Sequence, residues 1–525
     1  MKHLNFHALI AFTLMFPATG LAEEPKTVPW RGVTILHTND LHGHLTAWRG
    51  WEGDLAGKMV GGMDRMGAAV NKVRQEMGAE NVVLLDAGDT LGDTMIASQT
   101  QGKAVIEVMN ALDYTAMVIG NHEPDFSAPT LKERIGEARF PILAANITQK
   151  DSGQLFTKPY IIKEVRGTKL GILGLAYPST PATTAKKNVS GLEFGEASNV
   201  AREFIPKLKS EGAQLIVVLS HLGLQADKKL AKEVLGIDVI VGGHSHNRMK
   251  TALQEGNTFI VQAGAHGSDL GRLNLEIRNG KIVAHEHSLI TLDNAIVPSD
   301  PKIAALINNI HAPYYINLEE KIGRATAPIR RAQTIGGQEA GKRDQESPAD
   351  SLFADLIRDK TKADVVILPG LGYGTAIPQG MISAADLRNL IPHDSEIVTL
   401  QLTGLQIRDI LEQSLENTYA EDPAKNVGGV VQVSGIRFKY KAERKHPQRI
   451  MDVRINNAKL DPQRTYKVAT NSLLAEGGHN YTTFLQGKNK QQGASEYEVV
   501  RQGIQRSGKV RTPKPDRIEK VTDQN

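Results

Sequence analysis

The sequence has no cysteine and little excess of charge, and each absence excludes a class of protein. Without cysteine among its 525 residues, the chain can form neither disulfides nor thiolate metal sites, and it cannot use a thiolate nucleophile. A formal net charge of +4 is too small to argue for nucleic acid or an anionic membrane surface as a partner. The composition, with 40% hydrophobic and 23% charged residues, is ordinary for a soluble globular protein.

Long apolar runs are also missing. The run near the amino terminus, Ala8–Phe16, is far shorter than the roughly 20 residues that a membrane-spanning helix needs. It follows the basic residue Lys2 and precedes the small-residue stretch Gly20–Ala22, an order typical of a secretory signal peptide over residues 1–22. We therefore expect an exported protein, most simply in a bacterial periplasm, with no membrane anchor after cleavage.

The length of the chain and its pattern of apolar runs indicate two domains. One hydrophobic core stops growing well below 525 residues. Short β-branched runs alternate with helical stretches, which predicts an α/β domain with a buried sheet over residues 30–300. Helical periodicity in 301–322 predicts a connector, and a second α/β domain is expected at 323–505. The basic tail, 506–525, is expected to be poorly ordered.

Polar residues follow the apolar runs of the first domain where each predicted strand ends. Open α/β sheets bind ligands at this edge. A single histidine beside an apolar run is usually structural, but five runs end in imidazole, carboxylate or amide groups. These ligand types, without sulfur, fit zinc, manganese, iron or cobalt better than calcium or magnesium. The motifs are Asp40-x-His42, Gly88-Asp89, Gly120-Asn121-His122, Ser220-His221 and Gly243-His244-Ser245-His246.

The order of these motifs resembles that of the calcineurin-like metallophosphoesterases, and the whole chain is similar to the two-domain 5′-nucleotidase and UDP-sugar hydrolase family. The resemblance implies a first domain built as a β-sandwich flanked by helices, and a second α/β domain that binds substrate. It also implies two divalent metal ions, manganese or zinc first, with iron or cobalt as alternatives. Because a carboxylate can touch two ions, Asp89 is the bridging candidate. The implied ligands are Asp40, His42, Asp89 and His246 for one ion, and Asp89, Asn121, His221 and His244 for the other.

The motif "GNHEPD" contains His122 and Asp125, which match the catalytic pair of that family. The resemblance implies in-line attack on phosphorus by a metal-activated water, with protonated His122 offsetting phosphoryl charge and Asp125 orienting its ring. Asp86 and His44 are expected to support the ligands without binding metal. The implied substrate is a small-molecule phosphate ester, either a nucleotide or another ester, and no nucleic acid is expected as a partner.

The second domain departs from the nucleoside pocket of the family. The stretch "PGLGYGTAIPQG" places Gly374 or Thr375 where the family has a phosphate-binding arginine. His393 and Leu473 replace two stacking aromatics, and His479 replaces the aspartate that holds the ribose hydroxyls. Because each lost contact contributes about 1–3 kcal/mol, a weak grip on nucleosides is expected. The rings that could replace the lost aromatics are Tyr373, Tyr481 and Phe484.

Two other functions stay open. The stretch "PGLGYGTAI" is similar to elements of the periplasmic thiosulfohydrolase of bacterial sulfur oxidation, which shares the fold, uses manganese and acts on a sulfur-loaded carrier protein. A docking surface for such a carrier near the site would support this alternative. A non-catalytic, metal-dependent binding protein is the third hypothesis. It is disfavoured because the ligand set and the His122–Asp125 pair are both complete.

Overall fold

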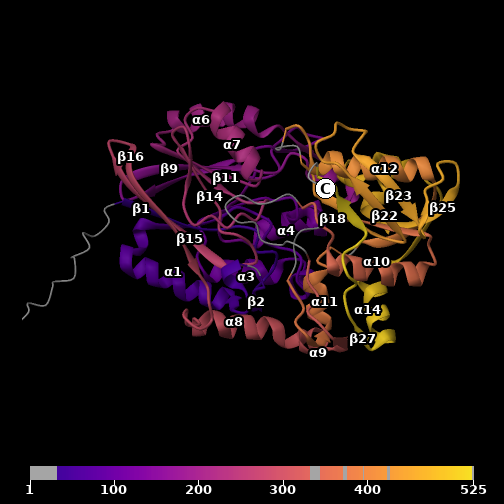
Figure 1. Ribbon diagram of the computed structural model, residues 1–525. Helices are drawn as coiled ribbons and strands as arrows, with labels where there is room; N and C mark the ends of the chain where they lie inside the picture. Colours follow the sequence, from indigo (N-terminus) through magenta and orange to yellow (C-terminus); the bar gives the residue numbers. More distant parts are fainter. Residues whose placement is uncertain are drawn as a thin grey trace, which may run out of the picture.

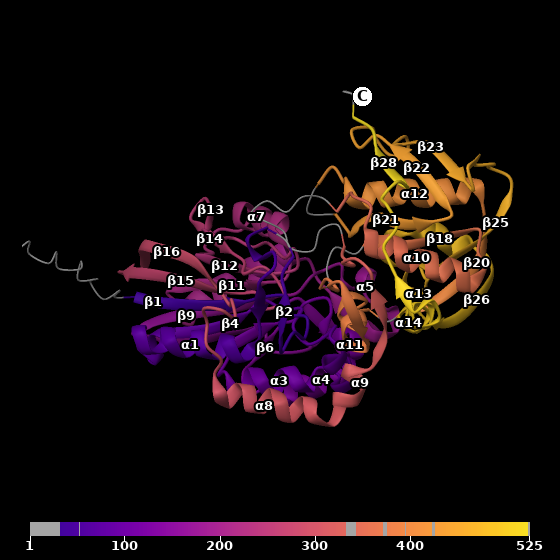
Figure 2. The ribbon, with the colours of Figure 1, turned by 60° about the horizontal axis from the view of Figure 1, so that its bottom comes forward.

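The computed structural model describes residues 32–51, 53–331, 343–370, 375–393, 395–422 and 426–522. The chain forms two α/β domains that lie side by side, the first coloured indigo to magenta and the second orange to yellow (Figure 1; Figure 2). The predicted signal peptide, residues 1–22, lies outside the described residues. Within the described ranges, no helix combines the length and the apolar composition that crossing a bilayer requires.

The first domain is built on two six-stranded sheets. In order across the first sheet lie β16 (Lys281–Thr291), β15 (Asp269–Arg278), β1 (Gly32–Thr38), β4 (Val82–Asp86), β5 (Ala116–Val118) and β6 (Ile142–Leu143). Across the second lie β13 (Leu253–Glu255), β14 (Thr258–Val261), β12 (Val239–Gly242), β11 (Leu215–Ser220), β9 (Thr168–Leu175) and β8 (Tyr160–Val165). Val33 and Ile35 of the first sheet share one buried core with Val217 and Leu219 of the second, so the sheets pack face to face.

Helices cover both outer faces of this sandwich. The first sheet is covered by α1 (Met63–Met77), α3 (Lys103–Ala111), α4 (Ala128–Glu137) and α8 (Pro301–His311), which share a core with it. The second is covered by α6 (Ala197–Ser210) and α7 (Leu224–Glu233). Strands buried on both faces are apolar throughout, which explains their continuous runs in the sequence. The predicted β-sandwich flanked by helices is therefore confirmed. The shorter elements are β2 (Ala47–Arg49), β3 (Met59–Gly61), α2 (Met95–Thr100), η3 (Glu123–Phe126), β7 (Ile147–Gln149), α5 (Thr180–Thr183) and β10 (Leu192–Phe194).

The second domain also mixes strands and helices. Its five-stranded sheet contains, in order, β21 (Gly429–Ser434), β18 (Val365–Gly370), β25 (Thr465–Asn471), β20 (Glu396–Thr403) and β26 (Lys488–Ser495). Two smaller sheets contain β24 (Ala458–Lys459), β23 (Ile450–Ile455), β22 (Ile436–Tyr440) and β28 (Ile518–Lys520), and β19 (Gly380–Ser383), β17 (Lys321–Ala325) and β27 (Lys509–Val510). The helices are α10 (Pro348–Thr361), α11 (Ala384–Leu390), α12 (Gly404–Thr418), α13 (Ser472–Ala475) and α14 (Glu496–Ser507). α12 shares one core with the large sheet, and α10 and α14 share another.

The segment predicted as the connector begins with α8 and continues through α9 (Tyr315–Glu319) into β17 of the second domain. The Asp300 side chain accepts hydrogen bonds from the backbone N–H groups of Lys302 and Ile303, which satisfies two donors at the start of α8. Ile303 and Ile307 are buried in the core beneath this helix. Apolar packing therefore fixes the first half of the connector to the first domain.

The expectation of a poorly ordered tail is wrong. β28 pairs in parallel with β22, so the tail adds a strand to a sheet. The Arg517 guanidinium lies 2.7 Å from an Asp355 carboxylate oxygen, and the Arg517 backbone N–H donates to Glu346 over 2.6 Å. The basic composition that suggested disorder thus reflects residues that pair with acidic groups of the second domain.

Candidate functional site

Loops at the carboxyl ends of five strands meet at one edge of the first domain. β1, β4 and β5 are neighbours in one sheet, and β11 and β12 are neighbours in the other. Six of the seven predicted metal ligands are buried, and His244 is half-buried. The seven residues that the loops present are Asp40, His42, Asp89, Asn121, His221, His244 and His246.

These side chains form two groups of three whose ligand atoms lie within 4.8 Å of one another: Asp40, His42 and His246, and Asp89, His221 and His244. His42 Nε2 lies 3.0 Å from His246 Nε2, and His221 Nε2 lies 2.9 Å from Asp89 Oδ2. Asn121 Oδ1 lies 2.8 Å from His244 Nδ1 and joins the second triad. Nitrogen and oxygen donors at these separations fit one divalent ion in each triad.

The backbone of the ligand loops is unusual. A left-handed conformation costs a residue other than glycine about 1–3 kcal/mol, and such residues cluster at functional sites. The Asp40 N–H donates to the Gly88 carbonyl over 2.8 Å, and the His42 N–H donates to the Asp89 carbonyl over 2.9 Å. These hydrogen bonds connect the loop after β1 to the loop after β4. The ligands with left-handed backbone are Asp40 (φ 51°), His42 (φ 47°), Asp89 (φ 55°), His244 (φ 72°) and His246 (φ 56°).

Opposite charges outweigh burial at Asp89 and His221. Burial acts to raise the pKa of Asp89, but the neighbouring His221 and His122 rings hold that pKa well below its usual range. Burial acts to lower the pKa of His221, but the Asp89 and Asp40 carboxylates raise it to about 10. The site therefore favours positive charge on His221, whereas burial lowers the pKa of His244 to about 3 and lowers that of His246 as well. A divalent ion would take the place of the added proton on His221, because metal ligation requires neutral imidazole.

The predicted catalytic pair lies beside the second triad. His122 Nδ1 is 2.7 Å from Asp125 Oδ2, and Thr184 donates its hydroxyl to Asp125 Oδ1 over 2.5 Å. The His122 N–H donates to Asp89 Oδ1 over 2.8 Å, so the loop that carries the pair is tied to the proposed bridging ligand. Burial acts to lower the pKa of His122, but Asp89 and Asp125 raise it well above its usual value. The His122 ring therefore favours its protonated, cationic form, which can donate a hydrogen bond.

Two residues predicted as supports shape the ligand loops. Asp86 accepts hydrogen bonds from the Thr38 and Thr90 hydroxyls, each over 2.6 Å, and from the Gly88 N–H over 3.0 Å. Burial raises the pKa of Asp86 to about 7, against these hydrogen bonds. His44 Nδ1 lies 3.1 Å from the His42 carbonyl oxygen, within the turn that presents the first ligands.

The Glu123 carboxylate is a support that the sequence analysis missed. It accepts hydrogen bonds from the backbone N–H groups of Asp89, Thr90 and Gly120, over 3.0, 2.7 and 2.6 Å. The side chain therefore fixes the loop after β4 against the loop after β5. The signal was present as the last letter of "GNHE", but no role followed from its spacing.

Asp93 and Tyr177 were also missed. An Asp93 carboxylate oxygen contacts His42 Nδ1, and Asp93 adopts a left-handed backbone with φ 85°. A carboxylate in this position orients a ligating imidazole. The Tyr177 ring stacks on His244 with centroids 4.2 Å apart. The second aspartate of "GDTLGD" was the available signal for Asp93, whereas no local pattern pointed to Tyr177.

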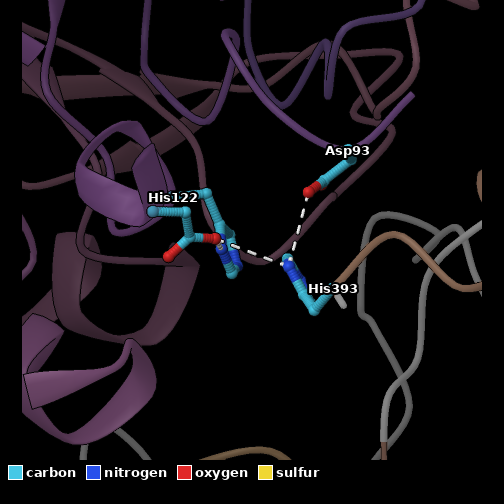
Figure 3. A group of neighbouring side chains, drawn as sticks. Asp93, His122 and His393 are labelled. Carbon is cyan, nitrogen blue, oxygen red and sulfur yellow. Dashed lines mark hydrogen bonds and ion pairs between the residues drawn. The ribbon is translucent and has the colours of Figure 1, made fainter. Parts of the chain in front are cut away.

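A cavity of about 800 Å³ lies over the site and is lined by both domains. Three of the residues predicted to bind substrate line it: His393, Leu473 and His479. Figure 3 shows the His393 ring facing His122 and Asp93. The His122 and His393 rings stack with centroids 4.2 Å apart. The second domain thus contributes side chains directly to the predicted catalytic pair.

Several residues predicted to bind substrate do not line this cavity. Tyr481 and Phe484 are 1% and 0% exposed and pack in the core beneath α12, so they do not serve as replacement stacking rings. Their rings form part of the hydrophobic core of the second domain. Thr375 is buried and is not among the residues that line the cavity. Its backbone N–H donates to the Asn389 carbonyl over 3.3 Å. Tyr373 and Gly374 lie outside the described residues.

The cavity nevertheless receives a guanidinium from a segment that the sequence analysis passed over. Arg343 precedes α10 and lines the cavity, and its carbonyl accepts the Val430 N–H over 2.9 Å. Burial acts to lower the pKa of Arg343, whereas the Asp40 carboxylate of the first triad acts to raise it. This guanidinium therefore lies within electrostatic reach of the candidate metal ligands. In "GKRDQESP" it looks like one of several surface charges.

Comparison with known proteins assigns both halves of the chain. A family model of the calcineurin-like phosphoesterases matches residues 33–248, and a family model of the 5′-nucleotidase C-terminal domain matches residues 321–486. The trifunctional nucleotide phosphoesterase protein YfkN of Bacillus subtilis is 28% identical over 97% of this chain, and the chain spans 36% of that longer protein.

Solved structures show the same arrangement. The 5′-nucleotidase precursor of Thermus thermophilus is 27% identical, with a TM-score of 0.85, and the match covers 94% of this chain and 99% of that one. The sulfate thiohydrolase SoxB of Thermus thermophilus has a TM-score of 0.85 at 24% identity, covering 94% of this chain and 97% of that one. At that identity the likeness concerns the fold alone.

Proposed function

We propose that this chain, a member of the two-domain 5′-nucleotidase family of calcineurin-like phosphoesterases, is an exported enzyme with two divalent metal ions. It hydrolyses nucleotides or other phosphate monoesters. The observation that supports this proposal is the meeting of two ligand triads and the His122–Asp125 pair at one cavity. A structural role alone does not explain two buried groups of imidazoles and carboxylates that open on a shared cavity.

Seven residues would bind the two metal ions that phosphate hydrolysis requires. Asp40, His42 and His246 would hold one ion, and His221, His244 and Asn121 the other, with Asp89 between them. When bound, two such ions supply a water of lowered pKa and positive charge that offsets charge on the phosphoryl oxygens.

The catalytic pair and the second domain complete the proposed site. His122 is kept cationic by its carboxylate neighbours and can donate a proton or hydrogen bond from Nε2, because Asp125 engages Nδ1. Arg343 would pair with the phosphate and hold it against the ligands. His393 and His479 line the cavity, and we infer that they contact the leaving group. They provide no carboxylate for a ribose diol, so other leaving groups should be accepted as well as nucleosides.

The proposal is tested by metal analysis and substrate profiling of the purified chain. The protein is loaded with manganese or with zinc and assayed on AMP, UDP-glucose, cyclic nucleotides and an aryl phosphate. A thiosulfonate-modified carrier peptide tests the thiosulfohydrolase alternative in the same series. We expect at least two ions per chain and metal-dependent release of phosphate.

Matched variants separate chemistry from folding. His122→Ala should keep both ions but lose about 100- to 10,000-fold in kcat, which is the usual range for a proton donor. His285→Ala, an exposed histidine of β16, serves as the control and should match the wild type. Release of sulfate from the peptide, with no phosphatase activity, would replace the proposal by the alternative. Export is tested separately by sequencing the amino terminus of protein taken from the periplasm.

A further inference from the structure

Four side chains from both domains form a third cluster beside the two triads. Asp93, His122 and Asp125 come from loops of the first domain, and His393 comes from the segment after α11 in the second domain. One ligand atom from each lies within 4.8 Å of the others. Figure 3 shows the His393 ring beside the His122 ring, on which it stacks, with Asp93 above it in this view. The cluster opens on the interdomain cavity, which all four residues line.

The two separations from His393 match those between ligands of one cation, whereas His122 and Asp125 form a direct pair over 2.7 Å. His393 Nδ1 lies 3.4 Å from Asp93 Oδ1 and 3.5 Å from Asp125 Oδ2. Both distances exceed the roughly 2.7–3.2 Å of an N–H···O hydrogen bond. Tetrahedral zinc, with bonds of about 2.0–2.2 Å to nitrogen and oxygen, places neighbouring ligand atoms about 3.3–3.6 Å apart. The two measured separations fall in that interval.

Both carboxylates are already oriented toward the cluster. The second oxygen of Asp93 contacts His42 Nδ1, and the second oxygen of Asp125 accepts the Thr184 hydroxyl over 2.5 Å. Each carboxylate therefore presents one oxygen to the shared centre, as outer contacts do around metal ligands. The side chains are accessible from the cavity, since His393 is 21% exposed and Asp125 is 24% exposed.

We propose that Asp93, His122, Asp125 and His393 form a third divalent-cation site that joins the two domains. Two imidazoles and two carboxylates are a donor set suited to zinc. The site is filled after the two triads, because one of its ligands must first be freed. His122 Nδ1 is bound to Asp125 over 2.7 Å, and a cation must displace the proton that this bond uses.

Occupancy of this site has a functional consequence that rests on the proposed function. A cation held by His122 and Asp125 removes the donor pair from the phosphoryl group, and its bond to His393 holds the second domain against the first. Zinc above two equivalents should therefore inhibit the enzyme.

The binding experiment does not depend on activity. Metal-free protein is titrated with zinc, and bound metal is measured by mass spectrometry after gel filtration. Wild type and the control His285→Ala should bind three equivalents, whereas His393→Ala should bind two. Asp93→Asn, whose asparagine tolerates the left-handed backbone, is a second variant and should also lose the third equivalent. Two equivalents in the wild type, or three in His393→Ala, would overturn the proposal.

Inhibition is then measured with an aryl phosphate. The zinc concentration that halves activity should rise at least tenfold in His393→Ala and stay unchanged in His285→Ala. Equal inhibition of both variants contradicts the assigned site. If the wild type binds three equivalents but hydrolyses no ester, the third site stands and the proposed function fails.

Discussion

The two domains carry their functional side chains in different ways. In the first domain, Asp40, Asp89 and His221 each lie within three residues of the end of a buried strand, so strand and ligand are close in the sequence. In the second domain, Arg343 and His393 lie on separate loops that reach the cavity only in the folded chain. The chemistry is thus encoded by local motifs, whereas the environment of the leaving group is assembled from distant segments.

The largest effect is expected from a substitution in the local ligand motifs of the first domain. Asp89→Asn removes the carboxylate charge that both ions would share, so kcat/KM should fall more than about 1000-fold, or roughly 4 kcal/mol. His44→Ala, which alters only the turn beside the ligands, should lose far less. Mass spectrometry of bound metal checks the cause. An unchanged number of bound ions in Asp89→Asn would show that Asp89 is not the bridge.

The second prediction concerns the pH dependence of stability that the buried Asp86 gives to the ligand loops of the first domain. The pKa of Asp86 is raised from 3.8 to about 7, so between these values the folded state keeps a proton that the unfolded state releases. Stability from this group is complete below pH 4 and is lost as pH rises toward 7, by up to about 4 kcal/mol. Asp86→Asn should remove this slope. Urea unfolding of the metal-free protein at pH 5 and pH 8 measures it, and parallel changes in both proteins would contradict it.

The third prediction concerns the second domain. Arg343→Ala should lower kcat/KM about 10- to 100-fold on every phosphate ester, since a hydrogen bond to a charged group contributes roughly 1.5–3 kcal/mol. AMP and an aryl phosphate should lose equally, because the contact is to the shared phosphate. Arg343→Lys, which retains the charge without the planar fork, should recover part of the loss. A loss confined to AMP would place Arg343 on the nucleoside.

The smallest effect measures leaving-group preference. His393, Leu473 and His479 are predicted to replace the groups that would hold a nucleoside. The kcat/KM for an aryl phosphate should therefore lie within about tenfold of that for AMP, or roughly 1.4 kcal/mol. The manganese-loaded protein is assayed on both substrates. With Tyr481 and Phe484 buried in the core, they cannot restore the preference. A thousandfold preference for AMP would require other groups to form a nucleoside pocket.

Sequence reasoning succeeded where chemistry and local structure coincide. The family resemblance and the two-domain α/β fold are confirmed, and the predicted ligands meet in two triads. Their metal-binding roles stay predictions. The reasoning failed where a side chain's surroundings depend on distant packing. Tyr481 and Phe484 had the right chemistry for stacking, but both close the core beneath α12. The basic tail carries a strand and an arginine that pairs with acidic groups.

The sequence by itself determined the strands, the order of the motifs and the reaction class. Each buried strand and the polar ligand loop after it are formed by residues that are close in the sequence, so both can be recognised locally. Only the tertiary structure decided that Arg343 lines the cavity and that His393 stacks on His122. Side chains far apart in the sequence leave no periodic or spacing signal of their contact. Their positions follow from the packing of one domain against the other, which is a property of the whole fold.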